Sequence, residues 1–562
     1  MVLEKGSAWR ENGGMKRYRE WDPRQNFLLP PSLLDWLPRE HAVYFLLDVV
    51  EQLDLSAIED ALQEKDHRGT RPFAPRMMVG LLLYGYCAGV FSSRKLERAT
   101  HENVGFRVLS GGLHPDHSAI CSFRKRFSEP LSDLFIQVLR LCQEAGLVKL
   151  GHVALDGTKV AANASKHKAN SYDRMKKRDG ELQVEIAALM EEAEKVDASE
   201  DAKYGKSKHG DELPAELHRR EDRLKRIKAA KEALEAEAAR AHAEHKIELA
   251  REAEKAAARA DEATAKVAES KAARAKERAN ERAARAFSKA QERFEHTAEE
   301  ATRLAASAKT HSERCKAASA EKAREAAQLE LDRVKQLCSG ADAEDTSPTL
   351  PEHRVPFDRH GDPQPCAQRN YTDPDSKIMK SGNGYIQGYN CQAAVDAEHQ
   401  IIVALAATNQ APDQEHLPPM LDAVIENCGR APDAFSADAG YWSESNAIHC
   451  ENADCEAYIA TGRQAHGERP KDDEEVVGNL DANEKRRAMR AKLRTPEGKA
   501  IYARRKAIVE PVFGQIKEAQ GLRRFLLRGI DMVRCEWSLV CTGHNLLKLF
   551  RARNASGLAA AR

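Results

Sequence analysis

The sequence has no apolar run long enough to cross a bilayer and no apolar segment of a secretory signal at its N-terminus. The longest apolar run, from Met77 to Phe91, is interrupted by Gly and is too short for a membrane-spanning helix. The first residues, MVLEKGSAWRENGG, are charged rather than apolar. We therefore expect an intracellular, cytoplasmic protein without a membrane segment.

Dense cysteine patterns are also missing. The chain has 12 cysteines in 562 residues, scattered singly, which excludes a small disulfide-stapled scaffold and favours free thiols. The one cluster is His449, Cys450 and Cys455, and no second pair follows at the spacing of a zinc finger. A zinc site is therefore disfavoured.

The chain carries no net charge, although charged residues make up 31% of it and aromatic residues only 6%. A formal charge of zero excludes a uniformly basic nucleic-acid binder but allows a basic surface on one domain. From Ile501 to the C-terminus there are twelve Lys and Arg against four Asp and Glu, a net of +8. A polyanion-binding surface is therefore expected in this C-terminal segment.

The N-terminal part, residues 1–145, is predicted to form a helical domain, because apolar residues recur with helical period between breaks at Gly and Pro. Asp116 can cap a short helix near its end. That helix carries three cations, which fit either a helix-turn-helix-like DNA reader or an ordinary solvated face. They are Arg124, Lys125 and Arg126.

The middle of the chain, residues 173–345, is rich in Ala, Glu, Lys and Arg and has almost no Gly or Pro. Long helices are predicted, and because large apolar residues are sparse, helical arms or a loosely packed coiled coil are favoured over a compact core. The Pro- and acid-rich segment 346–369 is predicted to be a linker, and 551–562 a flexible tail.

Strand patterns flank this insertion. Residues 152–163 contain an apolar run, and residues 388–409 predict a hairpin with its turn near Asp396 to His399. Alternating helices and short strands follow. The predicted fold class is α/β, an RNase H-like mixed sheet formed by residues 150–172 plus 370–550, with the helical arms inserted after the first strand.

Two aspartates are expected at strand ends in this sheet. An isolated Asp-Gly such as Asp156-Gly157 is most often only turn chemistry. Asp438, however, ends the apolar run AFSAD, and its strand is expected to neighbour the first. The pair of acids therefore predicts a site at one edge of the sheet.

Glu510 is the third candidate acid. It lies in a helix-period segment with an apolar row, and Tyr502, Lys506 and Lys517 share a polar stripe with it. The stripe also fits an ordinary solvated face. Pro511 predicts a new helix or a kink directly after Glu510.

Three converging carboxylates would repel one another without a cation between them, and oxygen ligands favour Mg²⁺, with Mn²⁺ as a substitute. Two such ions can activate an oxygen nucleophile and stabilise the leaving oxygen at phosphorus. Seven cations near Glu510 are expected to contact DNA phosphates. They are Arg504, Arg505, Lys506, Lys517, Arg523, Arg524 and Arg528.

Several blocks carry a family resemblance. They are RPFAPRMMVGLLLYGYCAGVFSSRKLE, VALDGTKVAANAS, TDPDSKIMK with GYNCQAAVD, ADAGYWSESN, and VEPVFGQIK followed by GLRRFLLRG. Through them nearly the whole chain resembles the DDE transposases of bacterial insertion sequences, most closely the insertion-sequence 1182 type. The resemblance implies an RNase H-like fold, magnesium-dependent cleavage and strand transfer, and a homodimer or larger assembly on double-stranded DNA, the element's terminal repeats and the target.

By this resemblance Asp156, Asp438 and Glu510 match the catalytic acids, and Tyr502 and Lys517 match the outer members of a Tyr-Arg-Glu-Lys signature. Its arginine corresponds to Arg505, with Lys506 as the competitor.

Two further motifs have alternative interpretations. TDPDSKIMK either braces the site or is a surface loop capped by Asp373 and Asp375. Trp442 either stacks on an unpaired base or, as we favour, packs half-buried.

Two other functions were weighed. A helical scaffold protein with an inactive head is disfavoured, because a scaffold does not need acids at two strand ends and on a basic helix. A metal-dependent nuclease of the same fold stays open, because water and a DNA 3′-hydroxyl use the same metals.

Overall fold

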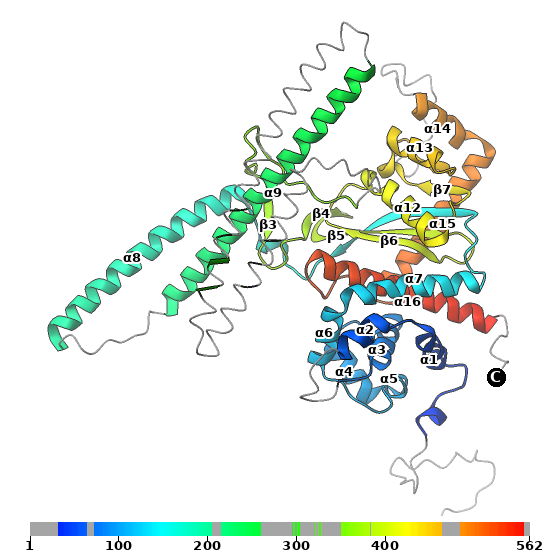
Figure 1. Cartoon of the computed structure of the whole chain (residues 1–562), viewed down its shortest axis with the longest axis horizontal. Coiled ribbons are helices and arrows are strands. Elements are labelled where there is room, and N and C mark those ends of the chain that lie inside the picture. Colours follow the sequence, from blue (N-terminus) through cyan, green and yellow to red (C-terminus); the bar gives the residue numbers. More distant parts are fainter. Residues whose placement is uncertain are drawn as a thin grey trace, which may run out of the picture.

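The computed structural model describes residues 32–63, 72–204, 215–259, 350–382, 384–462 and 484–555, together with a few isolated positions between 291 and 328. The chain forms a helical N-terminal part, a mixed α/β body, and two long helices that project from the body (Figure 1). Within these ranges, no helix combines the length and apolarity needed to cross a membrane.

The described residues between Leu33 and Glu144 form helices, in agreement with the helical periodicity of the sequence. Asp116 caps α6 as predicted, and its Oδ1 accepts hydrogen bonds at 2.8 Å from the backbone N–H groups of Ser118 and Ala119. The elements are η1 (Leu33–Trp36), α1 (Ala42–Gln52), α2 (Ser56–Gln63), α3 (Pro75–Cys87), α4 (Ser93–Glu102), α5 (Val104–Leu109), α6 (His117–Arg126) and α7 (Ser128–Glu144).

The centre of the body is a mixed six-stranded sheet in the order β4-β5-β1-β7-β8, with β6 also pairing with β5. The pairs β1–β5, β4–β5 and β5–β6 are antiparallel, whereas β1–β7 and β7–β8 are parallel. The strands are β1 (His152–Ala161), β4 (Lys377–Ser381), β5 (Gly384–Asp396), β6 (Ile402–Thr408), β7 (Ala434–Ala437) and β8 (Glu456–Ile459).

The predicted order of elements after the insertion is confirmed. β5 and β6 form the expected hairpin, and helices α12 (Leu417–Cys428) and α13 (Glu444–Asn452) separate the strands that follow it. β4 was not predicted, because it lies in the segment TDPDSKIMK, whose two aspartates indicate a loop.

Helix α16 (Ile530–Ala555) joins the sheet to the N-terminal helices. α16 and α7 lie along the same side of the sheet, with α1 to α6 beyond them (Figure 1). Trp537 on α16 is fully buried. The Asn545 side chain pairs with both backbone groups of Ile402 on β6, each at 2.9 Å. The N-terminal part and the sheet therefore share one core.

Of the two alternatives predicted for Pro511, the start of a new helix after Glu510 is wrong. α15 (Pro496–Gly514) continues through Pro511, follows α14 (Glu484–Arg494), and leads into a π-helical turn, η6 (Gln515–Ala519). Proline cannot donate to the carbonyl of the residue four positions earlier, Ala507. The side-chain amide of Gln400, from the β5–β6 turn, donates to that carbonyl at 3.0 Å instead.

The insertion begins after the first strand, as predicted, with α8 (Tyr172–Tyr204) and α9 (Ala215–Arg259). At their base, β2 (Ala169–Ser171) follows η2 (Lys166–Lys168) and pairs with β3 (Gln368–Asn370). Residues 260–290 and 329–345 of the predicted insertion lie outside the part of the chain that is described.

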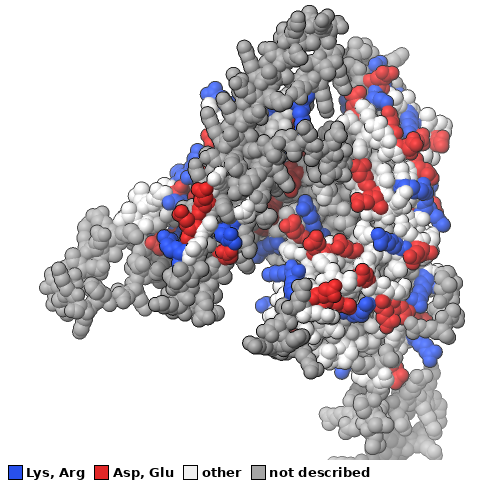
Figure 2. All heavy atoms as spheres, viewed as in Figure 1, with Lys and Arg blue, Asp and Glu red and all other residues white. Residues whose placement is uncertain are grey.

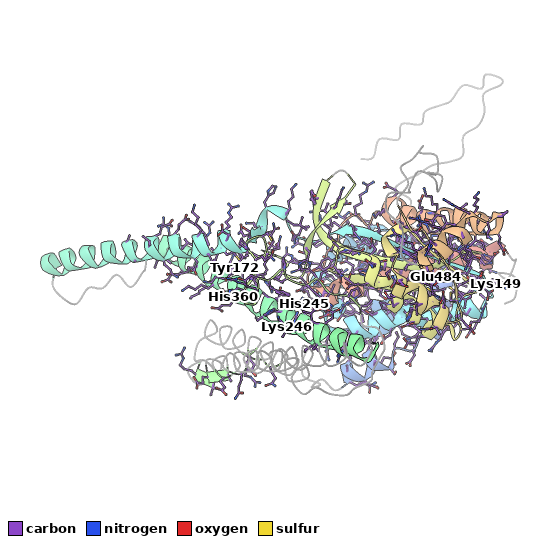
Figure 3. All side chains as sticks on the ribbon, turned by 90° about the horizontal axis from the view of Figure 1, so that it is seen from above. Lys149, Tyr172, His245, Lys246, His360 and Glu484 are labelled. Carbon is purple, nitrogen blue, oxygen red and sulfur yellow. The ribbon has the colours of Figure 1, made fainter. Side chains whose placement is uncertain are left out.

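Part of the predicted linker packs against the base of the two long helices. Val355 and Ala367 are buried against Tyr172 and Leu234 at the base of the helices. The Phe357 ring lies 5.0 Å from the ring of His242 on α9. Figure 3 shows His245 of α9 and His360 of this segment in the same region.

Candidate active site

Asp156 lies inside β1 and not at its end, so that part of the prediction is wrong. β1 continues because residues up to Ala161 pair with β5. Its parallel pairing with β7 covers only His152 to Ala154, so Asp156 lies just beyond the point where the two strands part. Asp438 directly follows β7, as predicted. Both aspartates therefore occupy the edge of the sheet where the parallel pair ends.

The Asp156 carboxylate is held by an arginine from a distant helix. Oδ2 accepts a hydrogen bond at 3.0 Å from Nη1 of Arg505, and Oδ1 accepts one at 2.8 Å from the N–H of Gly157. Burial raises the pKa of Asp156, the charge of Asp438 raises it further, and Arg505 and the Gly157 N–H oppose the increase. The ionised form of Asp156 therefore needs a positive charge beside it, and Arg505 provides one.

Arg505 is positioned by α15, which packs against β1, β5, β7 and β8. Only 7% of its side chain is exposed, and its guanidinium carbon lies 5.8 Å from the ring centroid of Tyr502, one turn earlier. Burial acts to lower the pKa of Arg505, but the charge of Asp156, its hydrogen bond with Arg505, and the nearby Tyr502 and Asp438 together outweigh burial and raise that pKa. Lys506, the competing residue, is exposed. Arg505 therefore faces Asp156 and is not a free phosphate ligand.

Asp438 shapes the turn that follows β7. Its Oδ1 accepts a hydrogen bond at 2.7 Å from Gly440, within the short helical turn η4 (Ala439–Tyr441) that it caps. A Cβ on Gly440 would lie 2.9 Å from this oxygen. The turn therefore requires glycine for the close approach of the carboxylate.

Sequence reasoning missed a further acid at this edge, Asp413. It lies between β6 and the short helix η3 (Gln414–His416), and its Oδ1 accepts three hydrogen bonds. The donors are Lys159 Nζ at 2.9 Å, Asn390 Nδ2 at 2.8 Å and Gln392 Nε2 at 2.9 Å. Burial acts to raise the pKa of Asp413, but Lys159 and the two amides outweigh it, so the pKa is lowered.

The Asp413 network lies on the face of β1 opposite to Asp156. Side chains alternate along a strand, so Gly157 and Lys159 point away from the side of Asp156. A Cβ on Gly157 would lie 2.5 Å from Gln392 Nε2 and 2.9 Å from Asp413 Oδ1. Tyr441 of η4 donates its hydroxyl to Gln392 Oε1. The network thus links the strand that carries Asp156 to the turn that follows Asp438.

The one sequence feature that could have pointed to Asp413 as a site residue is its position, an acid shortly after the second strand of the predicted hairpin. β6 runs in the same direction as β1, because each is antiparallel to β5. Its end therefore points to the same edge of the sheet as the ends of β1 and β7.

Glu510 is exposed on α15, five residues after Arg505. Ile508, Val512 and Ile516 form the buried row that the sequence predicts. In the described ranges, no three His, Cys, Asp or Glu side chains are grouped so as to hold a metal ion. The structure thus brings Asp156 and Asp438 together, and Glu510 does not complete a three-carboxylate group with them.

The residues predicted to contact DNA fall into different environments. Arg124 is 3% exposed and donates to the Tyr86 hydroxyl, the Phe91 carbonyl and Ser93, so its guanidinium group is engaged within the fold. Arg126 is exposed and donates to the carbonyl of Ala61. Arg523 pairs with Glu518, and Arg504 lies 3.9 Å from Glu398. Lys517 is half-buried, and burial lowers its pKa. The exposed members are Lys125, Arg126, Arg504, Lys506, Arg523, Arg524 and Arg528.

Two of these cations, predicted separately, line one cleft of about 470 Å³. Lys125 comes from α6, and Arg528 comes from the segment before α16, where its Nε donates to the carbonyl of Asn163 at 3.0 Å. Arg94 of α4 lines the same cleft. The cleft therefore joins the N-terminal helices to the chain that leaves β1.

The TDPDSKIMK segment is not a surface loop, and its acids brace the start of α16. Asp373 is fully buried and accepts hydrogen bonds from the Tyr389 hydroxyl at 2.8 Å and from the Gly529 N–H at 3.1 Å. Asp375 accepts one from the Ile530 N–H at 2.9 Å. The two acids therefore fix the start of α16.

Trp442 is half-buried against the core, which agrees with the packing interpretation. Cys450 and Cys455 are buried free thiols, and His449 pairs with Asp422 at 2.8 Å.

Two family models match the chain. Residues 446–550 match the model described as "Transposase DDE domain", and residues 31–126 match the one described as "Transposase domain (DUF772)". The first match includes α15 with Glu510, and the second ends at α6. The comparisons with curated proteins and with solved structures gave no match. The two matched segments indicate a DNA transposase, and they support the insertion-sequence DDE class in particular.

Proposed function

We propose that this protein is the transposase of an insertion sequence of the 1182 type, and that it cleaves and joins DNA through Asp156, Asp438 and Glu510. The observation that carries the proposal is the position of two aspartates at one sheet edge, Asp156 on β1 and Asp438 directly after the parallel neighbour β7, with Arg505 of the helix that bears Glu510 bonded to Asp156. An acid pair at such an edge is suited to hold hard cations against a DNA phosphate.

An RNase H-like core is part of this proposal. Three antiparallel strands, β6-β5-β1, continue into two parallel strands, β7 and β8, as in the mixed sheet that the sequence predicts. The proposed catalytic domain comprises residues 150–172 plus 370–550, with residues 1–145 as the DNA-binding domain and 173–345 as the helical insertion. Residues 346–369 are proposed as the connection between the insertion and the catalytic domain, with Val355 and Ala367 packed against the base of the insertion helices.

Mg²⁺, with Mn²⁺ as a substitute, fits the donors at the site. Asp156 and Asp438 offer carboxylate oxygens, and burial of Asp156 favours a nearby positive charge. Glu510 is proposed as the third ligand. Bound metal would supply activation of the oxygen nucleophile and stabilisation of the leaving oxygen. Arg505 holds Asp156 in its ionised form, and the Asp413 network keeps the two aspartate-bearing segments in register.

The exposed cations are proposed to hold double-stranded DNA beside the acids. Lys and Arg are interspersed with Asp and Glu over the face that Figure 2 shows, in line with the zero net charge. DNA binding therefore depends on local clusters such as the cleft with Lys125 and Arg528. Two DNA ends must be joined to one target, so a homodimer or a larger assembly on DNA is proposed.

The test is an incubation of the purified full chain with its element ends, a target plasmid and Mg²⁺. Joined product is expected from the unchanged chain. Asp156→Asn and Asp438→Asn are each expected to lower joining by more than about 100-fold. The matched control is Asp531→Asn, because 83% of the Asp531 side chain is exposed at the start of α16. Joining that survives Asp438→Asn would exclude the proposed site.

The same experiment separates a transposase from a nuclease. A nuclease would use the same carboxylates to cut the element ends without producing joined product. Cleavage that depends on Asp156 and Mg²⁺, but without joining to the target plasmid, would replace the transposase proposal with the nuclease.

A further inference from the structure

A basic cavity of about 1170 Å³ lies at the base of the two long helices. It opens between η2, β2, the first turns of α8, and α9, next to Tyr371 and Thr372. We call it the arm-root cavity. Figure 3 marks its neighbourhood by Tyr172, the first residue of α8.

The charged side chains around the cavity are mostly cations, with Glu181 and Asp222 as the two acids. Arg174, Lys177 and Arg178 are spaced three and four residues apart, so they share one face of α8. Arg223 and Arg226 share one face of α9 in the same way. Lys168 adds a charge from η2. The six cations are Lys168, Arg174, Lys177, Arg178, Arg223 and Arg226.

Most of this positive charge is not neutralised within the molecule. Arg178 pairs with Glu181 at 2.8 Å and with Glu185 at 3.1 Å. For Lys168, Arg174, Arg223 and Arg226, the described ranges contain no ion-pair partner, and all four are exposed. The arm-root cavity therefore presents a local excess of cations that is independent of the site at Asp156.

The cavity is built on a packed base. Met175, Leu182 and Ile227 are buried between α8 and α9, with Tyr371 packed against them. Asp179 pairs with Lys231 at 3.0 Å, and Tyr172 donates to Glu235 at 2.6 Å. The later residue of α8, Asp179, pairs with the earlier residue of α9, Lys231. The two helices therefore run antiparallel there. The two cationic faces are thus held in fixed positions before any ligand binds.

We propose that the arm-root cavity binds the phosphate backbone of double-stranded DNA. This inference rests on the proposed function, which supplies the polyanion. Arginine guanidinium groups donate in a planar fork that suits phosphate oxygens. A preformed cationic cavity lowers the entropic cost of binding a stiff duplex. The role of the insertion would then be to contact DNA through the segment that connects β1 to α8 and α9.

The experiment compares two triple variants of the full chain. The first, Arg174→Ala/Arg223→Ala/Arg226→Ala, removes three cations of the cavity. The control, Lys225→Ala/Lys228→Ala/Arg251→Ala, removes three exposed cations of α9 that do not line it. Binding to a fluorescent 30-base-pair duplex, flanked by the element end, is measured by anisotropy at several salt concentrations. Thermal unfolding by circular dichroism checks that both variants fold.

The cavity variant is expected to bind the duplex about 10-fold or more weakly at 100 mM salt. The slope of log K against log salt is expected to become shallower by about 3, roughly one for each lost phosphate contact. The control is expected to change the affinity by less than about 3-fold. Equal losses in both variants would overturn the inference, because they would show only a general effect of charge.

A second variant, expected to strengthen duplex binding, keeps the proposal testable if the triple cavity variant does not fold. Asp222→Asn removes one of the two acids at the cavity and is expected to tighten duplex binding by about 2- to 5-fold, by adding one net positive charge. Unchanged or weaker binding would count against the inference. Poly-glutamate that binds the cavity as tightly as the duplex would also overturn it, because it would favour an acidic protein partner.

The two proposals can fail separately. The unchanged chain could give joined product while the cavity variant binds the duplex as tightly as its control. That result would keep the transposase proposal and exclude only the DNA contact at the arm root. Absence of both duplex binding and joining would overturn both proposals.

Discussion

Arg505 donates to Asp156 across 3.0 Å, although 349 residues separate them in the sequence. The pair joins α15 to the central strand of the sheet at the position where β1 and β7 part. Because the Arg505 side chain is 7% exposed and that of Asp156 21% exposed, water screens the interaction only weakly.

Replacement of Arg505 by Ala is expected to destabilise the protein by about 2 kcal/mol, because it leaves a largely buried carboxylate without its charged partner. Urea unfolding at pH 7 measures the change. Arg505→Lys keeps the charge and is expected to recover part of the loss. Arg504→Ala is the matched control, since 60% of the Arg504 side chain is exposed. Equal stability of the Arg505→Ala and Arg504→Ala variants would contradict this role of Arg505.

Asp413 and Lys159 are expected to be energetically coupled. A double-mutant cycle of Asp413→Asn and Lys159→Met should give an interaction energy of about 1–2 kcal/mol at pH 7, since the ion pair is partly buried. The pKa of Asp413 is lowered in the folded state, so its contribution is present above the unfolded value of 3.8 and is lost as the pH falls through the folded value. An interaction energy near zero at neutral pH, or one that grows in acid, would disprove the coupling.

Acid is expected to destabilise the fold through three buried histidines. Burial is the largest cause that lowers the pKa values of His152, His416 and His544 to about 4, from 6.5 in an exposed histidine. Between these values the unfolded chain binds a proton that the folded chain does not, so stability falls as the pH decreases. Each histidine contributes a slope of up to about 1.4 kcal/mol per pH unit.

Urea titrations at several pH values measure this slope. His416→Gln is expected to make this slope of stability against pH shallower by about the contribution of one histidine. The measurement at pH 8 is the internal control, because all three histidines are neutral there in the folded and unfolded states. The substitution of the exposed His399 by Gln should leave the slope unchanged. A stability that is flat from pH 6.5 to pH 4.5 would contradict burial of the neutral rings.

Gln400 is expected to compensate for Pro511. Its side chain donates at 3.0 Å to the carbonyl of Ala507, which Pro511 cannot reach with a hydrogen bond. Gln400→Ala should therefore cost about 1 kcal/mol in the unchanged chain, measured by urea unfolding. In a Pro511→Ala background the new N–H can donate to Ala507, so the same substitution should cost less. An equal cost in both backgrounds would show that Gln400 acts elsewhere, for instance through Lys548, whose Nζ donates to Gln400 Oε1 at 2.8 Å.

Local patterns predict much of this protein. The helical N-terminal part, the cap at Asp116, the β5–β6 hairpin and the alternation of helices and strands up to β8 depend on periodicity and on turn residues close in the chain. The buried row on α15 follows from the same kind of pattern. The neighbourhood of Asp156 and Asp438 was predictable because parallel strands end at a common edge.

The errors in the site arise where a distant segment changes the local outcome. Asp-Gly indicates a strand end, but pairing with β5 carries β1 through Asp156 to Ala161. Pro511 indicates a break, but Gln400 satisfies the freed carbonyl. The charge of Arg124 indicates a surface residue, but Tyr86, Phe91 and Ser93 accept its hydrogen bonds in the interior.

The sequence by itself determined most of the element order, the start of the helical insertion after β1, and the acids Asp156 and Asp438 next to apolar strand segments, since each depends on residues close together in the chain. Only the tertiary structure decided which groups meet at the site: Arg505 on Asp156, Asp413 with Lys159, and the cations of the arm-root cavity. Burial strengthens the charge interactions of the first two pairs, whose residues lie hundreds of positions apart. The packing of α8 against α9 brings the exposed cations of the cavity together.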